Sequence, residues 1–151
     1  MQNLNFPTYS FRLKNSENNT HIFDVIRKKF VVLQPEEWVR QNCIQFLINE
    51  KNFPVNLINV EKVVKINGLN KRYDIIVYNS DGSIFLIVEC KAPKVKISQS
   101  AFDQIARYNL ALKASCLMVT NGLNHYFCTM DHNLGIYNFF KELPSYVKKK
   151  I

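Results

Sequence analysis

The sequence lacks the features that mark membrane and secreted proteins. No apolar run approaches the roughly 18 to 20 residues that a helix needs to span a bilayer. The polar start, Met1-Gln2-Asn3, lacks the basic-then-apolar layout of a secretory signal. We therefore expect no membrane segment and a cytoplasmic location.

Two kinds of cofactor motif are also missing. The four cysteines occur singly rather than in Cys-x-x-Cys pairs, which predicts neither a zinc site nor a disulfide framework. The sequence has no Gly-x-x-x-x-Gly-Lys-[Ser/Thr] loop of the kind that cradles nucleotide phosphates. We therefore expect ATP-driven translocation to be absent or to be supplied by a partner.

Acidic residues are scarce relative to basic ones. Twenty Lys and Arg against twelve Asp and Glu give a net charge of +8 and an isoelectric point of about 9.4. This balance favours a polyanionic partner, although a plain basic surface gives the same total. The 151 residues are 47 % apolar, enough for one packed core, which predicts a single domain over residues 1–151.

The order of predicted elements indicates an α/β protein. Residues 1–30 are an N-terminal extension with the alternation of a short hairpin. Gln34-Pro35-Glu36-Glu37 predicts a helix start, because Pro suits the first helical position and acids favour the first turn. We expect the strands to share one central mixed β-sheet. The predicted elements are a helix to about residue 51, an antiparallel meander at 57–66, 72–78 and 83–90, a helix at 98–113, a hairpin of 116–120 and 123–130 around Asn121-Gly122, and a short strand at 136–139.

Three ionisable residues stand in or at the end of two neighbouring predicted strands. Asp74 lies within an apolar run, and Glu89 and Lys91 end the next apolar run. Because side chains alternate along a strand, Glu89 and Lys91 emerge on one face while Cys90 emerges on the other. If the two strands pair through the turn at 79–82, Asp74 approaches Glu89.

This acidic pair points to metal chemistry. Two carboxylates held close repel each other unless a cation lies between them, and Mg²⁺ prefers oxygen ligands. The pattern therefore predicts a site for Mg²⁺ or Mn²⁺, with Lys91 placed to stabilise negative charge on a phosphate. A plainer interpretation is an ion pair of Glu89 with Lys91 at the sheet rim, with Asp74 solvated.

Asp74, fourteen intervening residues, and Glu89-Cys90-Lys91 together resemble the PD-(D/E)xK nuclease superfamily. Over about residues 34–130 the chain is similar to the N-terminal nuclease domain of type I restriction enzyme R subunits. Where the superfamily has a proline before the first acid, this chain has Tyr73. The similar segments are 35–41, 71–78, 88–93, 102–109 and 119–122.

The resemblance implies a restriction-endonuclease-like fold, a central mixed β-sheet flanked by helices, and a Mg²⁺- or Mn²⁺-dependent endonuclease that cuts DNA. It implies that Asp74 and Glu89 bind the metal, with the backbone carbonyl of Cys90 as a further ligand. Lys91 would be the catalytic base or would stabilise the transition state.

Further residues carry over from the same resemblance. Glu37 matches a first-helix acid that supports the metal site, and Glu36 competes for this role. Gln104 and Tyr108 match a Gln-x-x-x-Tyr element, whose spacing places both on one helix face. A plainer interpretation is that Glu36 and Glu37 only stabilise the helix dipole. In the same way, Gln104 would be an exposed amide and Tyr108 a half-buried aromatic residue.

Nucleic-acid contacts are expected from Arg72, Lys94, Arg107 and Tyr108, although a solvated surface explains the charges as well. The expected partners are DNA and other subunits of a restriction system, and a homodimer stays open. An alternative function is a non-catalytic nucleic-acid-binding or assembly module that keeps the nuclease fold. A third is a subunit that cuts only within a larger restriction or repair complex.

Overall fold

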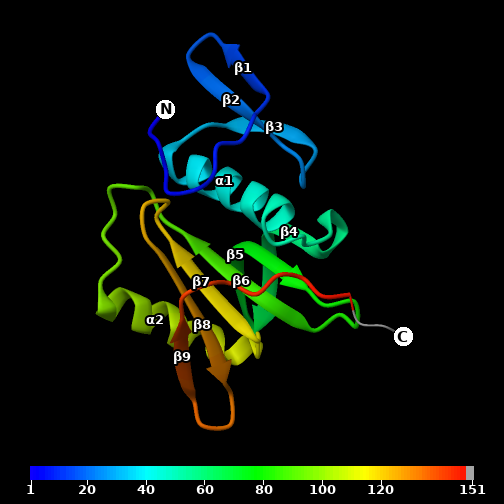
Figure 1. Cartoon of the computed structure of the whole chain (residues 1–151), viewed down its shortest axis with the longest axis vertical. Coiled ribbons are helices and arrows are strands. Elements are labelled where there is room, and N and C mark those ends of the chain that lie inside the picture. The colour runs from blue at the N-terminus through cyan, green and yellow to red at the C-terminus, as the bar shows by residue number, and fades with distance from the viewer. Residues whose placement is uncertain (149–151) are drawn as a thin grey trace.

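The computed structural model describes residues 1–148, and within that range the chain forms two β-sheets and two α-helices (Figure 1). The smaller sheet is antiparallel, in the order β1 (Leu13–Ser16), β2 (Asn19–Asp24) and β3 (Lys29–Val32). The larger sheet has six strands in chain order. They are β4 (Ile58–Ile66), β5 (Leu69–Tyr78), β6 (Ile84–Cys90), β7 (Cys116–Thr120), β8 (His125–Asp131) and β9 (Ile136–Phe140).

The larger sheet is mixed, which confirms the predicted fold class. Strands β4, β5 and β6 form the predicted antiparallel meander, and the β7–β8 and β8–β9 pairs are also antiparallel. Only the β6–β7 pair among these strands is parallel. A parallel pair needs a crossover connection, and here it contains α2 (Gln99–Asn109).

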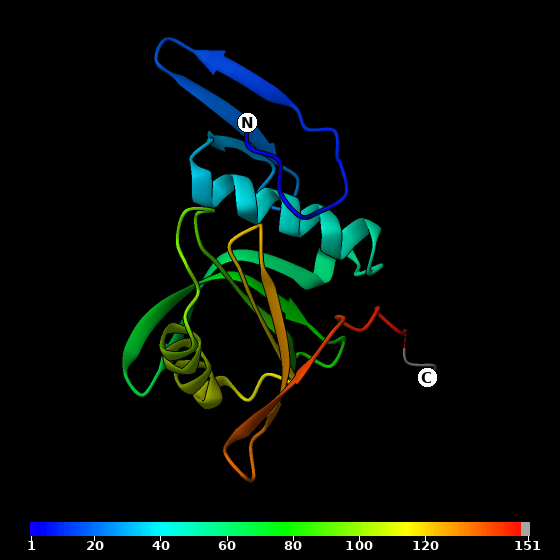
Figure 2. The ribbon, with the colours of Figure 1, turned by 60° about the vertical axis from the view of Figure 1, so that its left-hand side comes forward.

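Helices α1 (Pro35–Asn49) and α2 pack against opposite faces of the larger sheet (Figure 2). Ile75 and Val88 belong to the core that contains α1 residues, whereas Ile76 belongs to the core that contains α2 residues. This division follows from the alternation of side chains along a strand. None of the helices in residues 1–148 is long and apolar enough to cross a membrane.

Helix α1 begins at the predicted proline and is sandwiched between the two sheets (Figure 1). The apolar α1 residues Val39, Cys43 and Leu47 are buried, and Phe46 is half-buried. Polar residues are buried as well, because the N-terminal extension covers the side of the helix that faces away from the larger sheet. The buried polar residues of α1 are Glu37, Arg40, Gln41 and Asn42.

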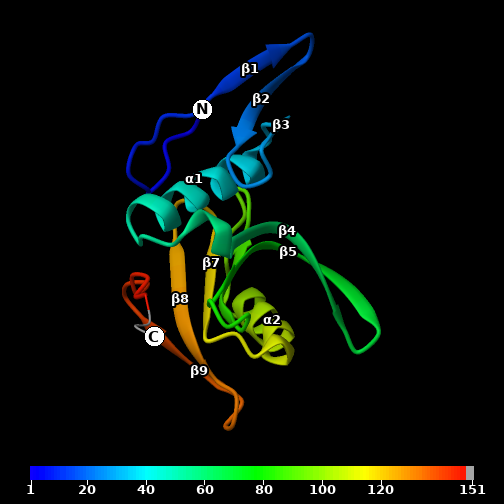
Figure 3. The ribbon, with the colours of Figure 1, turned by 90° about the vertical axis from the view of Figure 1, so that its right-hand side faces the viewer.

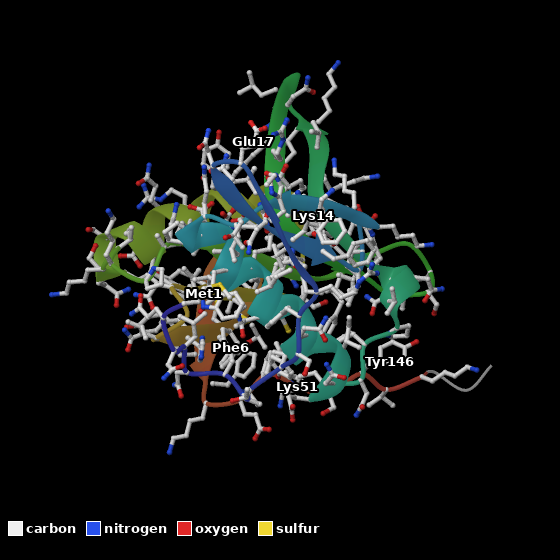
Figure 4. All side chains as sticks on the ribbon, turned by 90° about the horizontal axis from the view of Figure 1, so that it is seen from above. Met1, Phe6, Lys14, Glu17, Lys51 and Tyr146 are labelled. Carbon is white, nitrogen blue, oxygen red and sulfur yellow. The ribbon has the colours of Figure 1, made fainter. Side chains whose placement is uncertain are left out.

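The expectation that every strand shares one sheet is wrong for the extension. Its three strands form a separate sheet, because α1 lies between them and the larger sheet. The third strand follows a turn in which Asp24 Oδ1 accepts hydrogen bonds from the backbone N–H groups of Ile26 and Arg27, both at 2.8 Å. Figure 4 shows the β1–β2 hairpin, with Lys14 and Glu17, from above.

Two turns differ from the sequence prediction in length. Strand β5 begins at Leu69 rather than at residue 72, because Asn67 and Gly68 both have positive φ and close a tight hairpin. The turn between β7 and β8 spans four residues rather than the Asn-Gly pair alone. At its second position a Cβ on Gly122 would meet Leu4 at 2.8 Å, since the N-terminal segment passes over it.

Candidate active site

Asp74 and Glu89 lie across from each other on neighbouring strands. Strands β5 and β6 pair with Ile75 opposite Val88, so the next step along the ladder places Asp74 opposite Glu89. Asp74 Oδ2 accepts a hydrogen bond from the backbone N–H of Cys90 at 2.8 Å. The structure therefore brings the two acids together at one end of the β5–β6 pair.

Glu89 has an unusual environment for a carboxylate. Its side chain is 13 % exposed, and its Oε1 atom accepts no hydrogen bond from any residue in the described part of the chain. The nearest cation is the Lys71 ammonium, 3.7 Å from Oε1. Burial and the neighbouring charge of Asp74 raise the pKa of Glu89 to about 7, against the opposing charges of Lys71 and Lys91.

Lys91 lies directly beyond the end of β6. Its backbone N–H donates to Thr120 O on the parallel neighbour β7 at 2.8 Å, which holds the lysine at the sheet end. The charge of Lys91 acts to lower the pKa of both Glu89 and Glu36. Lys91 therefore lies close enough to both acids for its charge to act on them.

The two acids of the first turn of α1 point to different partners. Glu37 is buried and accepts hydrogen bonds from Arg40 at 2.8 and 2.9 Å and from Arg27 at 2.7 Å. Although burial acts to raise the pKa of Glu37, these guanidinium groups hold it below its ordinary value. Burial and the charge of Asp74 instead raise the pKa of Glu36. Glu36 thus senses the charge of Asp74 directly, whereas Glu37 is joined to Asp74 through Arg40.

Glu37 belongs to a group of ion pairs that we call the arginine cluster. Arg40 joins it to the site, since its Nη1 lies 3.0 Å from Asp74 Oδ1 and 3.1 Å from Glu61 Oε1. Arg27, in the extension, lies 2.7 Å from Asp24 Oδ2 as well as from Glu37. The members of the arginine cluster are Asp24, Arg27, Glu37, Arg40 and Glu61.

Sequence reasoning missed this cluster. Its local signals are two three-residue spacings, that of Asp24 with Arg27 and that of Glu37 with Arg40, the second of which places both residues on one face of α1. Glu61 gave no sequence signal. Its backbone has φ of 55° inside β4, a conformation that non-glycine residues adopt where surrounding contacts enforce it, and those contacts come from distant segments.

The remaining predicted site residues are spread over the surface. Tyr108 is linked to the acidic pair through Lys71, whose ammonium lies 3.8 Å from the centre of the tyrosine ring. Gln104 is exposed one turn earlier on α2. Arg72 is exposed and lies 3.7 Å from Glu61 Oε2. The structure leaves two further predicted residues exposed without bringing them to the acidic pair, Lys94 and Arg107.

The acidic pair fits a divalent cation through its oxygen atoms. Within residues 1–148 no set of three or more His, Cys, Asp or Glu side chains is arranged to hold a metal. Mg²⁺, however, is commonly bound by one or two carboxylates and keeps several waters. Asp74, Glu89 and the backbone carbonyl of Cys90 offer such donors. The unsatisfied Oε1 and the raised pKa of Glu89 are both features that a cation would relieve.

Comparison with known proteins identifies a family and a similar solved structure. The family described as type I restriction enzyme R protein N terminus (HSDR_N) matches residues 35–144. No curated protein matches the chain. A solved fragment described as an HsdR subunit of a type I restriction enzyme from Vibrio vulnificus YJ016 is similar, with 20 % identity and a TM-score of 0.45. The similarity covers 68 % of this chain and 22 % of the Vibrio chain.

Proposed function

This chain belongs to the family of type I restriction enzyme R protein N termini, and on that premise we propose that it hydrolyses phosphodiester bonds in DNA as a metal-dependent endonuclease. The family indicates a nuclease-like function in a restriction system. One observation carries the finer proposal: Asp74 and Glu89 face each other across β5 and β6, with Lys91 at the strand end.

Three groups would hold the metal, namely the Asp74 and Glu89 carboxylates and the backbone carbonyl of Cys90. When bound, Mg²⁺ or Mn²⁺ supplies positive charge that polarises a phosphoryl oxygen and lowers the pKa of water. Asp74 is already oriented by the Cys90 N–H and by Arg40, so its carboxylate needs little rearrangement to bind a ligand.

Lys91 and Glu36 would act on the reacting groups from either side of the acidic pair. The Lys91 ammonium would stabilise negative charge that develops on the phosphate or hold the attacking water. Glu36 is accessible to solvent, yet partial desolvation and the charge of Asp74 together raise its pKa. It is therefore suited to orient a water or hold a proton. The net charge of +8 would favour approach of the polyanionic substrate.

One observation favours a second candidate function, a nucleic-acid-binding or assembly module that does not cut. The Arg40 guanidinium lies 3.0 Å from Asp74 Oδ1 and already neutralises part of the charge that a metal would compensate. A restriction system in which this chain acts only beside other subunits is compatible with either function. The two functions differ in one outcome, which is strand cleavage in purified protein.

The test is a cleavage assay on supercoiled, linear and single-stranded DNA with Mg²⁺ or Mn²⁺. We expect Lys91→Ala to slow cleavage by on the order of 10² to 10³, because removal of one preorganised electrostatic stabiliser typically costs that much. The matched control is Lys141→Ala, which removes an exposed lysine that has no assigned role in the site. DNA binding without cleavage would support the non-catalytic module, and equal rates for parent and Lys91→Ala would contradict the assigned role of Lys91.

A further inference from the structure

A surface cleft opens beside the candidate active site. The β4–β5 hairpin arches away from the larger sheet on the side that carries α2 (Figure 3). A cleft of about 230 Å³ lies between the tip of this hairpin and α2. It is lined by Ile66, Asn67, Leu69, Lys71, Tyr108 and Ala111.

The walls of the cleft expose large apolar and aromatic groups. Leu69 is 68 % exposed on the hairpin, and Tyr108 is 53 % exposed on α2. Exposed apolar groups that face one another across a hollow mark a surface for binding rather than a surface for solvent alone. A planar, apolar group would cover both side chains.

Lys71 joins the cleft to the candidate active site. Its ammonium lies 3.8 Å from the centre of the Tyr108 ring and 3.7 Å from Glu89 Oε1. A molecule that contacts Tyr108 therefore lies next to the acidic pair. Lys71 lies between the cleft and the acidic pair. Its ammonium is therefore placed to bind the phosphate that links a group in the cleft to the reacting phosphate.

The charge of the hairpin favours a polyanion. Its outer part, residues 62–72, carries four basic residues and no acidic residue. An aromatic platform flanked by lysine and arginine is the arrangement that binds single-stranded nucleic acid, because bases stack on the ring while phosphates meet the cations. The four basic residues are Lys62, Lys65, Lys71 and Arg72.

The volume of the cleft limits the group that it admits. Sites for drug-sized ligands occupy roughly 300 to 1,000 Å³. The cleft has about 230 Å³, which suits one planar ring system and is too small for stacked base pairs. A base that remains paired in a duplex could not enter it.

We propose that this cleft binds one unstacked nucleobase of the strand being cut, which packs against Tyr108 and Leu69 with its phosphate toward Lys71. This inference rests on the proposed function, because it places the neighbouring phosphate at Asp74 and Glu89. It adds a substrate preference: the cut strand is single-stranded or locally unpaired where it passes between the hairpin and α2.

The test compares two labelled oligonucleotides of twelve nucleotides, one of thymidylate and one abasic, by fluorescence anisotropy in EDTA. Both carry the same phosphates, so their affinity ratio reports the contribution of the bases. We expect the parent to prefer thymidylate and Tyr108→Leu to weaken thymidylate binding roughly 5- to 150-fold, which is the contribution of a stacked base. Binding of the abasic oligonucleotide should not change.

Two further variants make the comparison specific. Tyr108→Phe keeps the ring and should keep the preference, whereas Leu69→Ser removes the opposite wall and should reduce it. Tyr126→Leu, at an exposed tyrosine on β8, is the matched control and should bind both oligonucleotides like the parent. Because Tyr108 and Leu69 are more than half exposed, their replacement should leave the thermal unfolding midpoint nearly unchanged.

Each outcome has one meaning. If the parent binds neither oligonucleotide, the nucleobase cleft is overturned, and the cleavage assay with Mg²⁺ or Mn²⁺ decides the proposed function separately. If the parent binds both equally, or if Tyr108→Leu keeps the thymidylate preference, nucleic-acid binding stands and the nucleobase cleft is overturned. The second result would leave an apolar peptide segment as the occupant to examine.

Discussion

The arginine cluster and the Asp74–Glu89 pair both gather acidic side chains, and they treat them in opposite ways. Glu37 receives hydrogen bonds from two guanidinium groups at 2.7 to 2.9 Å. Glu89 faces another carboxylate, and its nearest described cation is a lysine at 3.7 Å. Accordingly the pKa of Glu37 lies below its ordinary value, whereas that of Glu89 rises to about 7.

The contrast separates a structural use of charge from a binding use. A carboxylate that is saturated with arginine hydrogen bonds stabilises the folded chain and has little capacity left for a ligand. A buried carboxylate beside a like charge destabilises the apoprotein, and a bound cation removes that cost. Asp74 connects the acidic pair to the arginine cluster, because Arg40 binds one of its oxygens while Cys90 N–H binds the other.

The largest effect should follow from breaking the arginine cluster. We expect Arg40→Met to lower the free energy of unfolding by about 3 to 5 kcal/mol, because it leaves buried carboxylates without their partner. Urea unfolding followed by circular dichroism measures the change. Arg72→Met, which removes an exposed arginine, is the control. A loss under about 0.5 kcal/mol, the range of ordinary surface substitutions, would show that the cluster does not stabilise the fold.

The acidic pair should respond in the opposite direction. The pKa of Glu89 is raised from 4.5 to about 7, so its contribution to stability is present below pH 4.5 and is lost as the pH rises through 7. Glu89→Gln should therefore be more stable than the parent at pH 8, by about 3 kcal/mol, since one pKa unit corresponds to about 1.4 kcal/mol. Near pH 5 the difference should be small.

A metal titration checks the same residue independently. Mn²⁺ should raise the unfolding temperature of the parent at pH 8 and should leave Glu89→Gln unchanged. Glu50→Gln, an exposed change at the end of α1, is the matched control. Equal stabilisation of the parent and Glu89→Gln by Mn²⁺ would place the metal elsewhere.

The two neighbouring acids of α1 sharpen the comparison within one helical turn. Glu36→Gln should weaken Mn²⁺ binding about tenfold, the lower end of the effect of groups that support metal ligands, with little change in stability. Glu37→Gln should mainly lower the urea midpoint, because it weakens the bonds from Arg27 and Arg40. Isothermal titration calorimetry and urea unfolding on both variants separate the roles. If Glu37→Gln weakens Mn²⁺ binding and Glu36→Gln lowers the urea midpoint, the supporting role at the metal site belongs to Glu37.

The smallest effect is expected at the exposed edge of the cluster. Arg72→Gln should change the free energy of unfolding by less than about 0.5 kcal/mol, because exposed ion pairs contribute little. We expect weak, strongly salt-dependent DNA binding by the parent, with a slope of about −0.9 in log K against log salt for each phosphate contact. The variant should lose about one such contact. A filter-binding series with an unchanged or flat slope would contradict this prediction.

Much of the candidate site was predictable from the sequence, because it depends on local order. The strand that holds Asp74 and the strand that holds Glu89 are adjacent in the chain and joined by a short turn. Antiparallel pairing of such neighbours is set by the turn and by alternation. The order of elements around them is also local, which is why the mixed α/β fold and the position of Lys91 could be predicted.

Other features depended on contacts between distant segments. Glu36 and Glu37 are equivalent by sequence. Only the packing of α1 between two sheets brings Glu37 into contact with Arg27 and leaves Glu36 near the charge of Asp74. The separate sheet of the extension and the positive φ of Glu61 likewise depend on that packing.

The sequence by itself determined the fold class, the family and the strand positions of Asp74 and Glu89, because alternation and turn chemistry act over a few residues. Only the tertiary structure decided which carboxylates arginines neutralise and which are left facing each other. It also brought the hairpin tip to Tyr108 and so formed the cleft. Ion pairs and hollows depend on the meeting of residues far apart in the chain, and no local pattern encodes that meeting.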